Sequence, residues 1–167
     1  MTEQSAATAP VPTETNAIDP AAGADRPAIR ELLAMETRLT YADCDPAGII
    51  YFATWFPWME RIQSEWMVRN DLRQDTLLQR FGFKTITRAT ECEYLAQAAL
   101  FDRIEVSYGI ARMGRSSVRG EVRMTRIDDG VQVARGSITV VILDADNTPI
   151  EVPEPMRSLV LAALRDR

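Results

Sequence analysis

The stretch Asp43-Cys-Asp-Pro-Ala-Gly-Ile-Ile-Tyr-Phe52, which runs directly into Ala53-Thr-Trp-Phe-Pro-Trp-Met-Glu60, decides the fold of this chain. Its segment Asp45-Pro-Ala-Gly48 has the composition that a type I turn prefers, with Asp first, Pro second and Gly fourth. After the turn, large apolar side chains recur every three or four residues, at Trp55, Trp58, Met59, Ile62, Trp66 and Met67. This spacing predicts one long helix, ending near Asn70, that buries an aromatic stripe.

An alternating run precedes the turn. From Met35 to Tyr41 every second residue faces one side, which predicts a half-buried strand with Tyr41 on its buried face. The chain thus delivers two carboxylates, Asp43 and Asp45, between a strand and a buried helix. The simplest interpretation is that Asp45 caps a backbone N–H of its own turn. A functional interpretation is a carboxylate beside free N–H groups at a helix start, where an oxyanion could form.

The remainder of the chain predicts one antiparallel sheet. A short helix over Asp75–Gly82 is followed by four strands with period-two alternation, at 84–96, 102–113, 116–127 and 131–143. Gly114-Arg115 and Asp128-Asp-Gly130 are the expected hairpin turns, and residues 155–165 form an amphipathic helix. The fold class is therefore α+β, a sheet of about five strands around one long central helix. Because such a sheet leaves an edge uncovered, we expect self-association.

The chain of 167 residues suits one folded domain. Residues 1–29 are rich in Ala, Thr and Pro and contain no aromatic side chain, which predicts a disordered tail before a domain over residues 30–167. The N-terminal residues have neither the basic start nor the apolar core of a secretory signal, and no apolar run reaches the roughly 20 residues of a membrane span. We therefore expect a cytoplasmic protein.

Charge and composition exclude several kinds of chemistry. The net charge of −5, without a basic cluster, argues against nucleic-acid binding. The chain has no histidine, which excludes Ser-His and Cys-His nucleophile pairs and histidine-ligated zinc. Its two cysteines, Cys44 and Cys92, lack metal-site spacing, so we expect no metal. We interpret Cys44 as structural, because the carboxylates on either side of it disfavour a thiolate.

The segment Asp43–Phe52 with the tryptophan-rich helix resembles the hotdog-fold acyl-CoA thioesterases of the 4-hydroxybenzoyl-CoA thioesterase family. The resemblance covers roughly residues 35 to 155 and is helped by Cys92-Glu-Tyr94, Asp102-Arg-Ile-Glu-Val106 and Ile150-Glu-Val-Pro153. It implies a sheet wrapped around the helix, two chains paired edge to edge, and active sites at the dimer interface. We accordingly expect a homodimer at least and favour a homotetramer.

The resemblance also implies a catalytic set. Asp45 is the catalytic carboxylate, acting as a nucleophile or as a general base, and the Phe52 backbone amide is the oxyanion donor. Tyr51, at the helix start, is a candidate for contact with the acyl chain, whereas Asp43 is expected to stabilise the turn. A thioester carbonyl is electrophilic and its thiolate leaves readily, so a carboxylate suffices without histidine. No cofactor is expected, because coenzyme A is part of the substrate.

Candidate substrate-binding residues follow from the same resemblance. Glu60 falls where the hydroxybenzoyl-specific member carries an Asp that recognises the ring hydroxyl, although it could equally be an exposed residue paired with arginines. Arg112 and Arg115 flank the Gly114 hairpin, which matches a stretch that binds coenzyme A phosphates in the family. For Arg119 and Arg123 we favour a solvated strand face.

The leading hypothesis is therefore hydrolysis of an acyl-CoA to a free acid and coenzyme A, with an aromatic acyl group as one candidate. One alternative is release of acyl groups from an acyl carrier protein, whose substrate lacks the 3′-phosphate on adenosine. Another is a non-catalytic module that binds acyl-CoA. The helix tryptophans could stack on an aromatic acyl group, but a stripe at helical spacing is more often core.

Overall fold

The computed structural model describes residues 30–165, so the predicted disordered tail over residues 1–29 lies outside the described part of the chain. The elements are β1 (Leu33–Arg38), the 3-10 turn η2 (Phe52–Thr54), α1 (Trp55–Arg69), α2 (Leu77–Phe81), β2 (Lys84–Tyr94), β3 (Arg103–Met113), β4 (Ser117–Arg126), β5 (Gln132–Leu143) and α3 (Met156–Arg165). None of the helices within these residues is long and apolar enough to cross a membrane.

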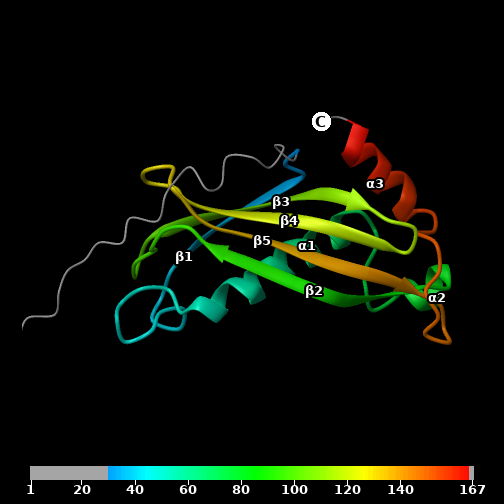
Figure 1. Cartoon of the computed structure of the whole chain (residues 1–167), viewed down its shortest axis with the longest axis horizontal. Coiled ribbons are helices and arrows are strands. Elements are labelled where there is room, and N and C mark those ends of the chain that lie inside the picture. Colours follow the sequence, from blue (N-terminus) through cyan, green and yellow to red (C-terminus); the bar gives the residue numbers. More distant parts are fainter. Residues whose placement is uncertain (1–29, 166–167) are drawn as a thin grey trace, which may run out of the picture.

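The five strands form a single antiparallel sheet in the order β1-β3-β4-β5-β2, so β1 and β2 are its edges. Figure 1 shows α1 running along one face of this sheet, which confirms the predicted fold class. Buried and half-exposed residues alternate along β4, so this strand shows which face of the sheet is covered by α1. Val118, Val122 and Met124 are buried toward α1, whereas Arg119 and Arg123 lie on the opposite, half-exposed face.

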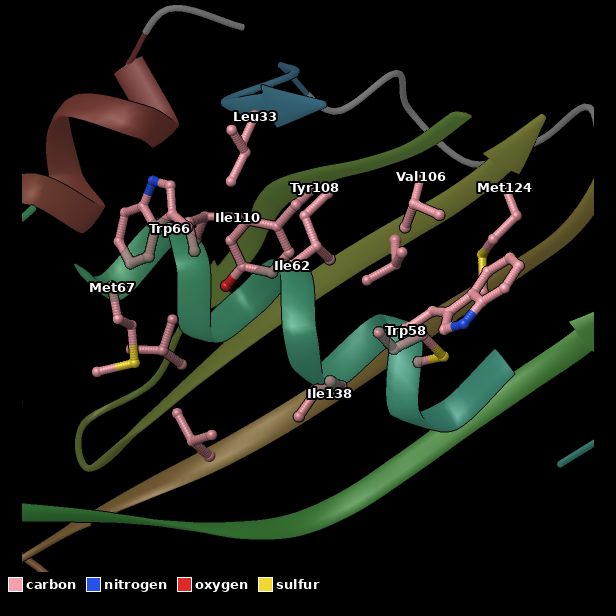
Figure 2. Close-up of a cluster of buried hydrophobic side chains, with 14 of the residues drawn as sticks. Leu33, Trp58, Ile62, Trp66, Met67, Val106, Tyr108, Ile110, Met124 and Ile138 are labelled. Carbon is pink, nitrogen blue, oxygen red and sulfur yellow. The ribbon is translucent and has the colours of Figure 1, made fainter. Parts of the chain in front are cut away.

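The aromatic stripe of α1 is core, as its spacing predicts. Trp55, Trp58 and Trp66 are at most 9% exposed. Figure 2 shows Trp58, Ile62 and Trp66 pointing from α1 toward the strands, where the rings of Trp66 and Tyr108 lie 5.8 Å apart between centroids. Burying this stripe supplies much of the hydrophobic driving force, since each large side chain contributes about 1.5–3 kcal/mol.

The first strand differs from its prediction. It spans Leu33–Arg38, so it begins and ends earlier than the predicted run from Met35 to Tyr41. Leu39 still points into the core, but the chain then turns, with the Asp43 N–H donating to the Thr40 carbonyl at 3.0 Å. Tyr41 is consequently 79% exposed rather than buried, because the alternation of the sequence continues for two residues beyond the strand pairing.

A close approach inside the sheet makes Gly120 sensitive to substitution. A Cβ at this position would clash with the Tyr108 ring, which is itself packed in the core. We expect Gly120→Ala to lower the free energy of unfolding by about 1–3 kcal/mol in chemical denaturation, because a rigid buried ring cannot move aside without strain. The control Glu121→Ala, on the opposite sheet face, should change it by less than about 0.5 kcal/mol. Equal stability of the two variants would contradict this packing.

Candidate active site

Asp45 is held by its own turn through only one carboxylate oxygen. The Gly48 N–H donates to the Asp45 carbonyl at 2.9 Å and the Ala47 N–H donates to Asp45 Oδ1 at 2.8 Å. Gly48 has φ of +77°, a left-handed conformation that glycine adopts without strain. Within residues 30–165 no donor contacts Asp45 Oδ2. The capping interpretation is therefore confirmed, and it leaves one oxygen of a half-buried carboxylate free for chemistry.

Asp43 is bound to the structure through one carboxylate oxygen and through its backbone carbonyl. Its Oδ2 accepts hydrogen bonds from the Thr40 N–H at 2.9 Å and from the Thr40 hydroxyl at 2.7 Å. Its carbonyl accepts the Tyr51 N–H at 2.9 Å and the Thr54 hydroxyl at 3.2 Å. The Asp43 carboxylate therefore stabilises the turn after β1, as predicted, while its backbone carbonyl fixes this turn to the start of the helix.

Backbone hydrogen bonds fix the two arms of this loop to each other and to the sheet. The Asp45 N–H donates to the Ile49 carbonyl at 3.0 Å, so the segment before the turn runs beside the segment after it. The Ile50 N–H donates to the Ala98 carbonyl at 2.9 Å, and the Leu100 N–H donates to the Gly48 carbonyl at 3.0 Å. The carboxylate thus sits on a loop anchored to the segment that leads into β3.

The chain then enters the helix at Phe52. The Thr54 N–H donates to the Tyr51 carbonyl at 2.9 Å, and the Tyr94 hydroxyl donates to the Phe52 carbonyl at 3.2 Å. The Phe52 N–H has no acceptor in the described part of the chain, as is usual for the first turn of a helix. Because η2 continues directly into α1, this N–H also lies at the positive end of the helix dipole.

An apolar cavity of about 210 Å³ opens beside this helix start. It is lined by Ile49, Ile50, Phe52, Trp55, Tyr94, Ala96, Gln97 and Ala98. The lining comes from two parts of the chain that are distant in the sequence, namely residues 49–55 at the helix start and residues 94–98 at the end of β2 and just after it. The side chains of Ile49, Ile50 and Phe52 therefore form one wall of a cavity beside the free Phe52 N–H.

Two predicted site residues lie outside this lining. The ring of Tyr51 packs on that of Phe52, with centroids 4.6 Å apart, and is about half exposed. Glu60 is exposed on α1 and accepts a hydrogen bond from Ser64; within residues 30–165 it has no arginine partner. Their contacts with substrate stay predictions.

The predicted phosphate-binding arginines are exposed but remote from the turn. Arg112 and Arg115 make no ion pair within the described residues, whereas Arg119 pairs with Glu91 at 2.8 Å. The loop that carries Asp45 joins the sheet at the start of β3, and the hairpin with both arginines follows its end. β3 has 11 residues, which is roughly 35 Å of strand. One chain therefore places the carboxylate and the arginines at opposite ends of the sheet (Figure 1).

The two thiols are poor nucleophiles in this environment. Burial raises the pKa of Cys44, and the nearby Asp43 and Asp45 raise it further. Burial raises the pKa of Cys92 to about 11, with a smaller contribution from Glu93. Both are therefore protonated near neutral pH, which agrees with a structural role for Cys44 and leaves the carboxylate of Asp45 as the candidate nucleophile or base.

These features together support acyl transfer without histidine. A carboxylate with a free oxygen can attack or activate water, and an unpaired main-chain N–H at a helix start can stabilise the oxyanion that forms. The apolar cavity beside that N–H can hold an acyl group. On a five-stranded sheet wrapped around one helix, this arrangement is that of a hotdog-fold thioester hydrolase.

Comparison with known families agrees with that class. The sequence model of the thioesterase-like superfamily matches residues 39–163, and the chain belongs to this superfamily. The matched range contains the acidic turn, the helix and all of the sheet except β1.

Curated relatives are more distant. An acyl-CoA thioesterase YbgC from Haemophilus influenzae is 21% identical over 72% of this chain and 88% of its own length. An acyl-CoA thioester hydrolase YbgC from Escherichia coli is 30% identical over 52% of this chain, and the match spans 64% of the length of that relative.

Solved structures share the fold at low identity. A 1,4-dihydroxy-2-naphthoyl-CoA thioesterase from Synechocystis superposes with a TM-score of 0.71 at 17% identity, covering 80% of this chain and 97% of its own. A mutant 4-hydroxybenzoyl-CoA thioesterase complexed with 4-hydroxybenzoyl-CoA has a TM-score of 0.69 at 20% identity, covering 77% and 97%.

Proposed function

We propose that this thioester hydrolase acts on acyl-CoA and releases a free acid and coenzyme A, with Asp45 as nucleophile or general base. The observation that carries the proposal is the free Asp45 Oδ2 on the same anchored loop as the unpaired Phe52 N–H. The names of the curated YbgC relatives support the substrate class.

Two routes give the same products. In the first, an Asp45 oxygen attacks the thioester carbon, the C–S bond breaks, and water then hydrolyses the mixed anhydride to restore the carboxylate. In the second, Asp45 takes a proton from the water that attacks the carbonyl. In both, the carbonyl oxygen becomes negative and the Phe52 N–H donates to it. One such donor is worth about 3 kcal/mol in the transition state.

The uncovered edge of the sheet supports a homodimer. β2 is an 11-residue edge strand with no partner on its outer side in the described residues, and Ile86 and Tyr94 on it are exposed. Antiparallel pairing of β2 with β2 of a second copy would give the expected homodimer and remove this edge. It would also bring the hairpin end of the second sheet beside the Tyr94 end of the first. The arginines remote in one chain would then approach the site of the other. Two such dimers would form the homotetramer.

Arg112 and Arg115 give this arrangement a test. We expect the double variant Arg112→Ala/Arg115→Ala to raise the KM for an acyl-CoA at least about 10-fold, because charge-assisted hydrogen bonds to the phosphates are lost. The KM for the same acyl group on pantetheine, which has no nucleotide, should not change. Arg123→Ala, on the outer sheet face, is the matched control. An unchanged KM for the acyl-CoA would contradict this role and favour a carrier-protein substrate.

Hydrolysis itself is tested by following thiol release from acyl-CoA esters with a thiol-reactive dye. The proposal requires release that depends on enzyme concentration and continues over many turnovers. Binding of an acyl-CoA without thiol release over several hours would instead identify a binding module.

A further inference from the structure

The cavity at the helix start indicates the charge and the size of the acyl group that the site accepts. Its walls are formed mainly by aliphatic and aromatic side chains, including Ile49, Ile50 and Trp55, and by the small Ala96 and Ala98. Gln97 and Tyr94 are its only polar side chains, and the Tyr94 hydroxyl is already committed to the Phe52 carbonyl. No charged side chain is part of this lining.

Arg126 is hydrogen-bonded to a residue of the lining, but its charge is already neutralised by two carboxylates. Arg126 donates from Nη1 to the Gln97 carbonyl at 2.8 Å. The same guanidinium pairs with Asp129 at 2.7 Å and with Asp102 at 3.6 Å. It therefore has little capacity left to bind a carboxylate on a substrate. The neighbouring loop of the same chain adds negative charge through Asp43 and Asp45, which disfavours a carboxylate on the acyl group at this end of the cavity.

The volume limits the size of the acyl group. An apolar cavity of about 150 Å³ can hold benzene, so a cavity of about 210 Å³ has room for one aromatic ring. One benzoyl ring or a chain of about six to eight carbons fills such a space, whereas a sixteen-carbon chain exceeds it. The aromatic walls at Phe52 and Trp55 also favour a ring, since aromatic pairs add to simple area burial.

We propose that the acyl group is uncharged and apolar, with the size of one aromatic ring or a chain of about six to eight carbons, and that Ala96 sets the space available to it. This inference rests on the proposed hydrolysis of acyl-CoA at the same site. Ala96 is chosen because it lines the cavity and is only partly buried, so that a larger side chain there reduces the space in the cavity.

The charge requirement is tested with two esters of equal carbon number, hexanoyl-CoA and adipoyl-CoA, which differ by a terminal carboxylate. We expect kcat/KM for adipoyl-CoA to be at least about 100-fold lower, because its carboxylate would be buried without a partner. Benzoyl-CoA should resemble hexanoyl-CoA, and palmitoyl-CoA should be at least about 10-fold poorer. Comparable rates for adipoyl-CoA or palmitoyl-CoA would overturn the inference.

The size requirement is tested with Ala96→Val. Two added methyl groups should lower the ratio of hexanoyl-CoA to acetyl-CoA turnover at least about 10-fold, because each methylene in an apolar pocket changes selectivity by that order. Ala99→Val is the matched control, since Ala99 is exposed and outside the lining. An unchanged ratio in folded Ala96→Val would refute the assignment of this cavity.

Binding measurements test the preference of the cavity independently of hydrolysis. Titration of the Asp45→Asn variant with hexanoyl-CoA and adipoyl-CoA measures recognition without turnover. We expect hexanoyl-CoA to bind at least about 10-fold more tightly. If the wild-type protein hydrolyses none of the esters while this preference holds, the proposed hydrolysis fails and the cavity inference stands. If hydrolysis occurs without this preference, the cavity inference fails alone.

Discussion

Asp45→Asn is expected to lower kcat/KM for hexanoyl-CoA by about 10²–10⁴-fold while the protein stays folded. The amide removes the negative charge that, in the proposed mechanism, attacks the carbonyl or takes a proton from water. It keeps an oxygen that can still accept the Ala47 N–H, so the turn is preserved. Initial rates of thiol release on both proteins measure the change.

A charge-matched control accompanies this variant. Asp75→Asn removes an exposed carboxylate that pairs with Arg73 and is not part of the cavity lining, and it should leave kcat/KM within about twofold. The unfolding transition of Asp45→Asn should overlap that of the wild-type protein. If Asp45→Asn keeps full activity on the preferred ester, Asp45 is not the catalytic carboxylate.

Trp66→Ala is expected to lower the free energy of unfolding by about 3–5 kcal/mol, the largest stability effect that we predict. Trp66 is 8% exposed and its ring packs against Tyr108 on β3, so truncation leaves a cavity between α1 and the sheet (Figure 2). This loss is a large fraction of the roughly 5–15 kcal/mol that a domain possesses. Urea denaturation followed by circular dichroism measures it.

Two further variants keep this prediction testable. Trp66→Phe retains a ring and should lose clearly less stability than Trp66→Ala, so it serves if the alanine variant does not fold. Val68→Ala, on the exposed side of α1, should change the free energy of unfolding by less than about 0.5 kcal/mol. Similar values for Trp66→Ala and Val68→Ala would show that the stripe is not core.

Sequence periodicity predicted the main elements because it reports which face of each element is buried. The spacing of Trp55, Trp58 and Trp66 matched the buried side of α1, and the Gly114 and Asp128–Gly130 turns separate strands as expected. Periodicity failed at Tyr41, which continues the alternation after the strand has ended. What ends β1 is a local turn closed by Thr40, and such a turn does not interrupt the alternation of residues.

The candidate site was predictable in part. The acidic turn and the free N–H at Phe52 lie within one short segment, so local chemistry could suggest both. The apolar cavity was missed, because its wall at Ala96 and Ala98 comes from a distant segment that meets the helix start only in three dimensions. The cluster of alanines between two strands was the one available signal. The remoteness of the Arg112 hairpin likewise depends on strand order in space, which the sequence does not display.

We propose that the Phe52 N–H binds the carbonyl oxygen of a thioester while Asp45 attacks its carbon or activates a water to do so. A crystal structure with a hexanoyl-CoA analogue, in which a methylene replaces the thioester sulfur, tests it most directly. We predict the ketone oxygen at about 2.7–3.1 Å from the Phe52 nitrogen, with Asp45 Oδ2 or one intervening water facing the carbonyl carbon. An analogue whose carbonyl lies away from both groups, with its chain outside the cavity, would contradict the account.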